Sequence, residues 1–344
     1  NNANYALFII NNKTNKGVIN MNDLKKVGLS ALAGSLVAMS ANAAEVSISG
    51  GASLGMYQES DNDKTLFYNN DSITFTVTGE TDGGLVLTNT VELDASSAHA
   101  GGTDNAITTI EVPGAGTITY GRHGASSVVG GWDSVAPTAY EEVWDVTETK
   151  ASAAASVIGG ASGNGLWRYD SPSFSGVQFS ASYDSTANTS TTNSTPVSGY
   201  ADMGISVSPD MVEGLSLGYA SGEFEEAAGR DIDVSTLWIK YAYGPVTVSY
   251  QDSENDGPSA AHSDESEEWG ISYAVSDDLS VSYGQHEYNG GTDSATDMQE
   301  SEGFSISYTM AGTTIAASFN DITNVAGSAA EDNEGYEINV SFAF

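Results

Sequence analysis

The chain ends in a strict alternation of apolar and polar residues. The apolar side of this segment carries Tyr336, Ile338, Val340, Phe342 and Phe344, and the other side carries Glu337, Asn339, Ser341 and Ala343. A period of two describes a strand with one apolar face and one polar face. In a soluble sandwich the apolar face meets a second sheet, whereas in a membrane barrel it meets lipid and the polar face lines water. One strand fits both architectures, so the rest of the chain must decide.

Alternation of this kind recurs along the chain from residue 44 onward. The predicted strands are 45–57, 71–79, 85–94, 105–113, 117–122, 166–175, 177–187, 199–208, 214–226, 230–243, 245–252, 264–276, 279–288, 297–311, 313–322 and 334–344. Opposite the apolar residues stand Ser, Thr, Gly and acids, a face too polar for the dry interior of a sandwich. The pattern therefore favours a barrel in which the polar face lines a lumen.

The connections between these strands alternate in length. Short links with Gly, Pro or Asp follow every second strand, and longer loops fall between them, the longest at 123–165. Short turns on one edge and long loops on the other are typical of an even-numbered, up-and-down barrel with both termini at the short-turn edge. The sequence therefore predicts an all-β fold for residues 44–344, a 16-stranded antiparallel transmembrane β-barrel.

Two positions break the alternation. In 230–243, Ile232 and Val234 lie on one face but Leu237 and Ile239 lie on the other, so we expect a bulge near Ser235 that returns both pairs to the lipid face. Asn89 falls on an otherwise apolar outward face, and the sequence offers no reason for it.

The N-terminal residues are predicted to lie outside the barrel. Residues 21–43 join Lys25 and Lys26 to an apolar run and then to Ala41-Asn42-Ala43, the pattern of a cleaved secretory signal. The run is too short for a bilayer, which needs about 20 residues. Residues 1–20 are rich in Asn and are interpreted as an upstream or disordered leader.

The formal charge of −36, from 46 acids and 10 basic residues, limits the possible partners. Nucleic acids and anionic membrane surfaces need lysine and arginine, so both are disfavoured, whereas cations are attracted. Loss of residues 1–43 would leave 45 acids and six basic residues, a net charge of −39. The chain has no cysteine for disulfides or thiolate metal sites.

Three further segments resemble the general porins of Gram-negative bacteria, especially the alphaproteobacterial type. They are Ala44-Glu45-Val46-Ser47-Ile48-Ser49-Gly50, Gly116-Thr117-Ile118-Thr119-Tyr120-Gly121-Arg122 and Trp167-Arg168-Tyr169-Asp170-Ser171-Pro172-Ser173-Phe174-Ser175-Gly176, together with the terminal Phe344. The resemblance implies an outer-membrane homotrimer without enzymatic activity. It also implies a long third loop folded into the lumen, passive diffusion of small hydrophilic solutes, and a terminal phenylalanine that serves as a membrane-assembly signal.

The same resemblance suggests which residues face passing solutes. The third loop would contribute the acids of a constriction, namely Asp133, Glu141, Glu142, Asp145 and Glu148. Basic residues of the opposing wall would be Arg168, which alternation directs inward, Arg122, which must leave its strand to do so, and Lys240. A loop that is merely solvated is the competing interpretation of these acids.

The excess of acids leads to the expectation of a cation-preferring pore. No cofactor is expected, although acids such as Asp61, Asp63, Asp264, Glu265, Glu267 and Glu268 could bind Ca²⁺ or Mg²⁺ weakly. The alternative function is that of a non-conducting barrel or secreted β-protein whose acidic loops serve adhesion or surface structure.

Overall fold

The computed structural model describes residues 44–60, 64–94, 103–145, 158–163, 165–185, 197–226, 231–258, 263–290, 298–329 and 332–344. Contacts within the chain group residues 44–344 into one compact unit. The predicted leader and signal, residues 1–43, lie outside the described residues. Within the described part, no helix is long and apolar enough to cross a membrane.

The described unit is built almost entirely from strands. They are β1 (Glu45–Glu59), β2 (Leu66–Glu80), β3 (Val86–Asp94), β4 (Asn105–Val112), β5 (Gly116–His123), β6 (Ala125–Ser126), β7 (Ser162–Gly163), β8 (Leu166–Asp170), β9 (Val177–Asp184), β10 (Val197–Val207), β11 (Leu215–Glu226), β12 (Ile232–Tyr243), β13 (Val246–Asp256), β14 (Asp264–Ala274), β15 (Leu279–Gly290), β16 (Gln299–Met310), β17 (Thr313–Thr323) and β18 (Asn333–Ala343). Single 3₁₀ turns occur at η1 (Gly130–Trp132) and η4 (Val325–Gly327).

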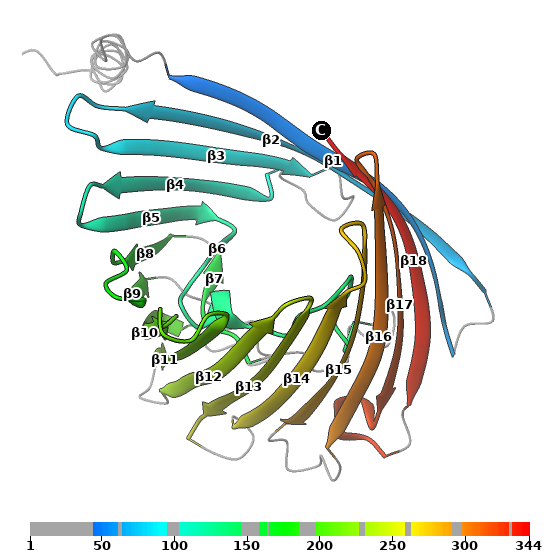
Figure 1. The fold of residues 1–344 in the computed structure, drawn as a ribbon. Coiled ribbons are helices and arrows are strands. Elements are labelled where there is room, and N and C mark those ends of the chain that lie inside the picture. The colour runs from blue at the N-terminus through cyan, green and yellow to red at the C-terminus, as the bar shows by residue number, and fades with distance from the viewer. Residues whose placement is uncertain are drawn as a thin grey trace, which may run out of the picture. The chain divides into compact units, whose positions relative to one another are not determined.

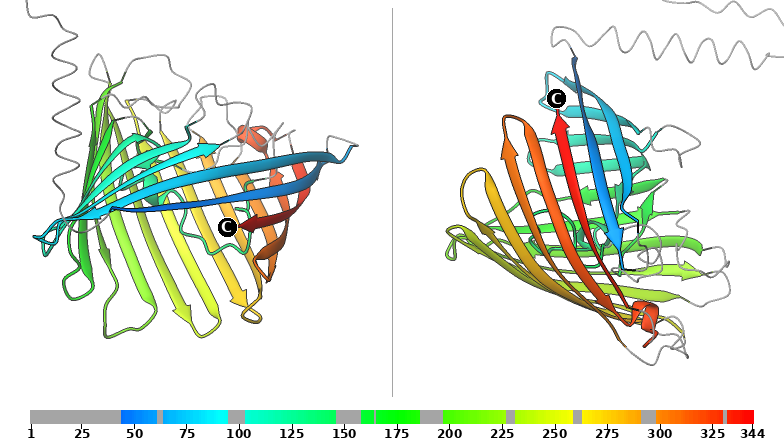
Figure 2. Two further views of the ribbon diagram at one scale, coloured as in Figure 1. Left: turned by 90° about the horizontal axis from the view of Figure 1, so that it is seen from above. Right: turned by 90° about the vertical axis from the view of Figure 1, so that its right-hand side faces the viewer.

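Sixteen of these strands close into one antiparallel ring, which confirms the predicted fold class. Neighbours in the ring are neighbours in sequence, except that β5 pairs with β8 across the longest connection and β1 pairs with β18. Figures 1 and 2 show β1 and β18 side by side where the ring closes. The short strands β6 and β7 pair only with each other. Closure leaves no strand edge of the ring unpaired.

The pleat separates an apolar outer face from a mostly polar inner face. Large apolar side chains such as Phe75, Ile205 and Phe319 are exposed on the outside, while alternate residues such as Ser182, Ser249 and Ser318 are buried on the inside. An exposed apolar surface of this extent is not stable in water and suits contact with lipid.

The short links carry the glycines that a tight reversal needs. Gly176 and Gly214 have φ values of 79° and 81°, in the left-handed region that only glycine adopts without strain. A Cβ at either position would lie 2.0 Å from a backbone carbonyl oxygen of the next turn. These close approaches fix the short-turn edge of the ring.

The expected bulge near Ser235 is wrong. Strand β12 keeps an unbroken register with both β11 and β13, so Ile232 and Val234 point into the lumen while Leu237 points outward. The reason is packing. Ile232 and Val234 belong to a buried apolar cluster inside the barrel, and that cluster replaces the lipid that the sequence pattern suggested for them.

Other departures from the expected strands are local. The strand predicted at 166–175 ends at Asp170. The Ser171 amide then donates to the Phe179 carbonyl of β9, and Ser171 Oγ accepts from the Phe179 amide. Asn89 does lie outward, and its Nδ2 donates a hydrogen bond of 2.8 Å to Oγ1 of Thr108 on the neighbouring strand. The pairing satisfies both polar groups on an apolar face.

The inward position of Val234 can be tested with cysteines, since the chain has none of its own. We expect Asp233→Cys to react readily with a water-soluble maleimide, because Asp233 is exposed on the outer face. Val234→Cys, at a site 2% exposed, should be protected in the same folded preparation. Equal reaction of the two variants, measured by mass shift, would indicate a bulge after all.

Candidate functional site

The described start of the longest connection runs inside the ring of strands. Residues 124–145, here termed the inner segment, leave β5 and follow the inner wall formed by β10 to β18 (Figure 1). The segment has little regular structure of its own, namely β6 and η1. Its position must therefore be set by contacts with the wall.

The first part of the inner segment is held by apolar packing. Val128 and Val129 are fully buried, and Trp132 packs beside them. Trp132 also meets Trp238 of β12 edge to face, with ring centroids 5.5 Å apart. The wall supplies the rest of the cluster, which includes Leu166, Tyr200, Ala220, Phe224, Ile232 and Val234. This apolar patch on an otherwise polar inner face anchors the segment by excluding water.

From Val129 onward the segment is also held by hydrogen bonds to polar side chains of the wall. Gln251 is representative, since its Oε1 accepts from the Val135 amide at 2.8 Å and its amide nitrogen donates to the Trp132 carbonyl. The other contacts are Val129 N to Asp202, Ser134 Oγ to Glu268, Ala139 N to Ser282, Tyr140 N to Ser305, and Asn320 Nδ2 to the carbonyls of Glu142 and Asp145. Strands β10, β13, β15, β16 and β17 thus satisfy backbone groups that would otherwise be buried without partners.

A row of glycines lets the segment lie close to the wall. Gly270, Gly284 and Gly303 stand directly opposite one another on β14, β15 and β16. A Cβ at Gly270 would lie 3.0 Å from Ala136, and one at Gly284 or Gly303 would lie 3.3 or 3.2 Å from Val143. Side chains at these positions would push the segment inward, so the three glycines allow the segment to lie against the wall.

The acids of the inner segment divide into two groups. Asp133 is exposed just after η1, and its Oδ1 accepts from the Ser134 amide at 2.9 Å. Glu141, Glu142 and Asp145 instead converge, with carboxylate oxygens that all lie within 4.8 Å of one another. The structure therefore brings together three of the five predicted acids. Glu148 lies outside the described residues.

Convergence changes the acidity of this group. Burial, and after it the neighbouring charge of Asp145, raises the pKa of Glu141 from 4.5 to about 7. The pKa of Glu142 is raised as well, again mainly by burial. Tyr140, adjacent in sequence, has a raised pKa because it is buried and its hydroxyl donates to Glu337 of β18. Near neutral pH Glu141 therefore exchanges its proton.

Arg168 points inward as alternation predicts, but it does not present a free charge. Its guanidinium donates to both carboxylate oxygens of Asp170 at 3.0–3.1 Å, and Nη1 donates to the Ser127 carbonyl at 3.1 Å. The arginine is therefore paired on its own strand and holds the start of the inner segment.

The other two predicted basic residues are Arg122 and Lys240. Arg122 does not leave its strand, and that expectation is wrong. It is the extra residue of a bulge in β5, since Ala106 pairs with His123 and Ile107 with Gly121. The side chain of Arg122 is exposed. Lys240 lies on the inner face of β12, between Trp238 and the short-turn end, as predicted.

The remaining predicted residues are the acids expected to bind divalent cations weakly and the terminal Phe344. Asp61 and Asp63 lie outside the described residues, and Asp264 to Glu268 form the start of β14, where Glu265 and Glu267 point outward and Glu268 inward. The four described acids of this set therefore do not all face the same side of the sheet. Phe344 is exposed, and its backbone exchanges two hydrogen bonds with Gly50, which extends the β1–β18 pairing.

Comparisons with known proteins agree with the geometry. A family model described as Gram-negative porin matches residues 28–300. No curated protein sequence matches the chain. Among solved structures, an anion-selective porin from Comamonas acidovorans is 14% identical with a TM-score of 0.64, covering 88% of this chain and all of that one. An engineered variant of the Rh. blastica porin is 19% identical with a TM-score of 0.58, covering 87% of this chain and all of that one. These identities show the fold alone.

The shifted acidity of Glu141 predicts a proton equilibrium near neutrality. Carboxyl NMR of ¹³C-glutamate-labelled protein should show a resonance with a midpoint at about pH 7 that is missing in Glu141→Gln. Because the folded pKa exceeds the ordinary value of 4.5, the stabilising contribution of this group is present at acid pH and lost as the pH rises through about 7. A titration of every glutamate below pH 5.5 would contradict the burial described here.

Proposed function

This chain belongs to the Gram-negative porin family and forms an outer-membrane channel for passive diffusion, and we propose that the inner segment makes this channel prefer cations. Porins are channels, not enzymes. The proposal rests on one observation, the convergence of Glu141, Glu142 and Asp145 on a segment inside the barrel. Solutes that pass beside these carboxylates would meet a negative potential, which raises the local concentration of cations.

The scarcity of positive charge supports the same proposal. The sixteen strands of the ring contain only three lysines or arginines, namely Arg122, Arg168 and Lys240. Arg168 is paired with Asp170, Arg122 is the extra residue of the bulge in β5, and Lys240 points inward. The selectivity in the name of the Comamonas porin belongs to that protein, whereas the preference proposed here follows from the charges of this chain.

Three related properties complete the proposal. The solutes would be small and hydrophilic, because the inner wall is rich in Ser, Thr and Asn. Any Ca²⁺ or Mg²⁺ would be held loosely by the converging acids, whose oxygens suit hard cations. The channel would assemble as a homotrimer after removal of residues 1–43, with Phe344 acting as the assembly signal.

Substitution of the three acids tests the selectivity directly. Glu141→Gln, Glu142→Gln and Asp145→Asn together should shift the zero-current potential toward zero in a gradient of dilute KCl across a planar bilayer. The shift should shrink in concentrated salt, since the Debye length falls from about 10 Å at 0.1 M to about 3 Å at 1 M.

The matched control removes three charges from the outer face. Glu223→Gln, Asp233→Asn and Asp256→Asn lie opposite one another on β11 to β13 and should leave the potential nearly unchanged. Arg168→Ala should increase the cation preference, because it removes a positive charge and leaves Asp170. If the inner triple variant keeps the parent's potential, the converging acids do not control ion passage.

A further inference from the structure

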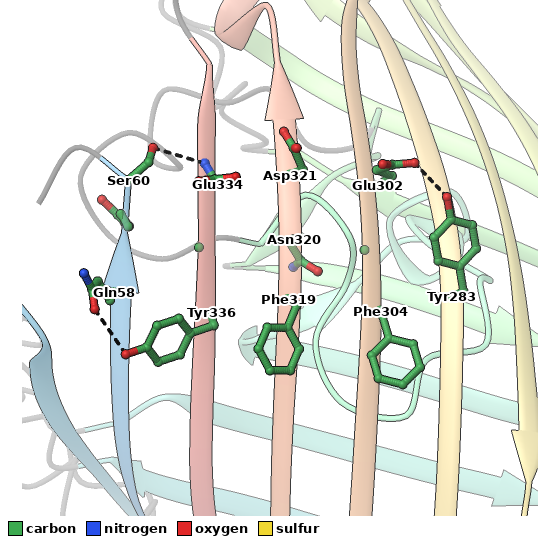
Figure 3. Close-up of a pocket in the computed structure, with 13 residues that line it drawn as sticks. Gln58, Ser60, Tyr283, Glu302, Phe304, Phe319, Asn320, Asp321, Glu334 and Tyr336 are labelled. Atoms are coloured by element: carbon green, nitrogen blue, oxygen red, sulfur yellow. Dashed lines mark hydrogen bonds between the residues drawn. The ribbon is translucent and has the colours of Figure 1, made fainter.

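The outer wall of the barrel carries a groove that the channel function does not use. It spans β15 to β18 and β1 and has a volume of about 490 Å³ (Figure 3). Its floor is a row of four aromatic rings on adjacent strands. Tyr283 stands opposite Phe304, Phe304 opposite Phe319, and Phe319 opposite Tyr336. Phe304 and Phe319 are 42% and 51% exposed, so their faces are open to a ligand.

A row of carboxylates borders this aromatic floor on the long-loop side. Glu302 stands opposite Asp321, and Asp321 opposite Glu334, each two residues from an aromatic residue of the floor (Figure 3). Glu302 accepts hydrogen bonds from Tyr283 and Gln285. Like charges placed directly opposite on a sheet repel each other. The five strands that form the groove contain no lysine or arginine that would offset this repulsion.

A third row lies on the other side of the aromatic floor. Val281, Ile306, Ala317, Ile338 and Met56 are opposite one another in turn, and all are apolar. The outer face thus passes from aliphatic to aromatic to carboxylate over four residues along β16, β17 and β18. Aromatic rows mark the boundary between the hydrocarbon and the headgroups of a membrane, and long loops mark the outer side. The carboxylates accordingly lie at the level of outer-leaflet headgroups.

We propose that this groove binds a membrane lipid whose headgroup carries an ammonium group. The ammonium would lie between the carboxylates of Asp321 and Glu334 and the faces of Phe319 and Tyr336, which attract cations through their π electrons. The acyl chains would lie along the aliphatic row. The excess of negative charge selects this headgroup over one that carries only a phosphate, because the phosphate would be repelled by three carboxylates.

Two lipids with the same chains and the same phosphate isolate the role of the amine. Phosphatidylethanolamine has the ammonium group, and phosphatidylglycerol lacks it. The full chain, folded in a neutral maltoside detergent, is incubated with each lipid and the retained lipid is counted by native mass spectrometry. We expect about tenfold more retention of phosphatidylethanolamine, the size of effect that one desolvated ammonium contact produces.

Isosteric substitutions assign the site. Glu302→Gln, Asp321→Asn and Glu334→Gln together should abolish the difference between the two lipids while leaving conductance unchanged. The control is Glu223→Gln, Asp233→Asn and Asp256→Asn, which removes a row of three opposed carboxylates from β11, β12 and β13. Two residues along β11 and β12, at the level where the groove has aromatic rings, these strands carry Ser221 and Ser235. This control variant should retain the preference of the parent.

Three results would overturn the proposal. Equal retention of both lipids would show that the amine is not recognised. Retention of phosphatidylglycerol that depends on added Mg²⁺ would show instead that a divalent cation bridges the carboxylates to a phosphate. A change of oligomeric state in the groove variant, with no lipid retained by the parent, would show that a second copy of the chain covers this face.

Discussion

The structure depends on the requirement that backbone amides and carbonyls inside the barrel find hydrogen-bond partners. The inner segment has almost no regular structure, so it satisfies only a few of these groups itself. Side chains of the wall do so instead, and each such hydrogen bond contributes about 1 kcal/mol, whereas an unpaired buried group costs more than that. Gln251 and Asn320 each make two of these contacts. The wall thereby determines where Glu141, Glu142 and Asp145 lie.

The alternation of the pleat lets neighbouring residues serve opposite sides of the barrel. In β17, Phe319 contributes to the outer aromatic row while Asn320 holds the inner segment. In β18, Tyr336 lies in the outer groove while Glu337 accepts the hydroxyl of Tyr140. A shift of register by one residue would therefore exchange both functions at once, which explains why these strands keep an unbroken pairing.

Much of the barrel could be predicted from the sequence because a lipid-facing strand has a simple period. The number of strands, their order and the long connection between β5 and β8 all follow from alternation and loop length. The pattern failed where the inner face is not polar. Ile232 and Val234 suggested lipid contact, but they pack against Val128 and Val129 of a segment that is distant in sequence. Period alone cannot identify such a partner.

The site was harder to predict for a related reason. The family resemblance and charge identified Glu141, Glu142 and Asp145, but nothing in the local sequence shows that their carboxylates converge or that Arg168 is paired with Asp170. The residues that position the acids are ordinary Ser, Asn and Gln. The one signal available was the recurrence of inward glycines at 270, 284 and 303, which become meaningful only once the register aligns them.

The most direct test of this account is a covalent link between the inner segment and the wall. A Cβ at Gly270 would lie 3.0 Å from that of Ala136, close enough for a disulfide after a small adjustment, and the chain has no other cysteine. We predict that Ala136→Cys with Gly270→Cys forms this disulfide under mild oxidation, with single-channel conductance unchanged when a reductant is added. Absence of the disulfide in folded protein, or a conductance that rises on reduction, would show that the segment does not lie along the wall.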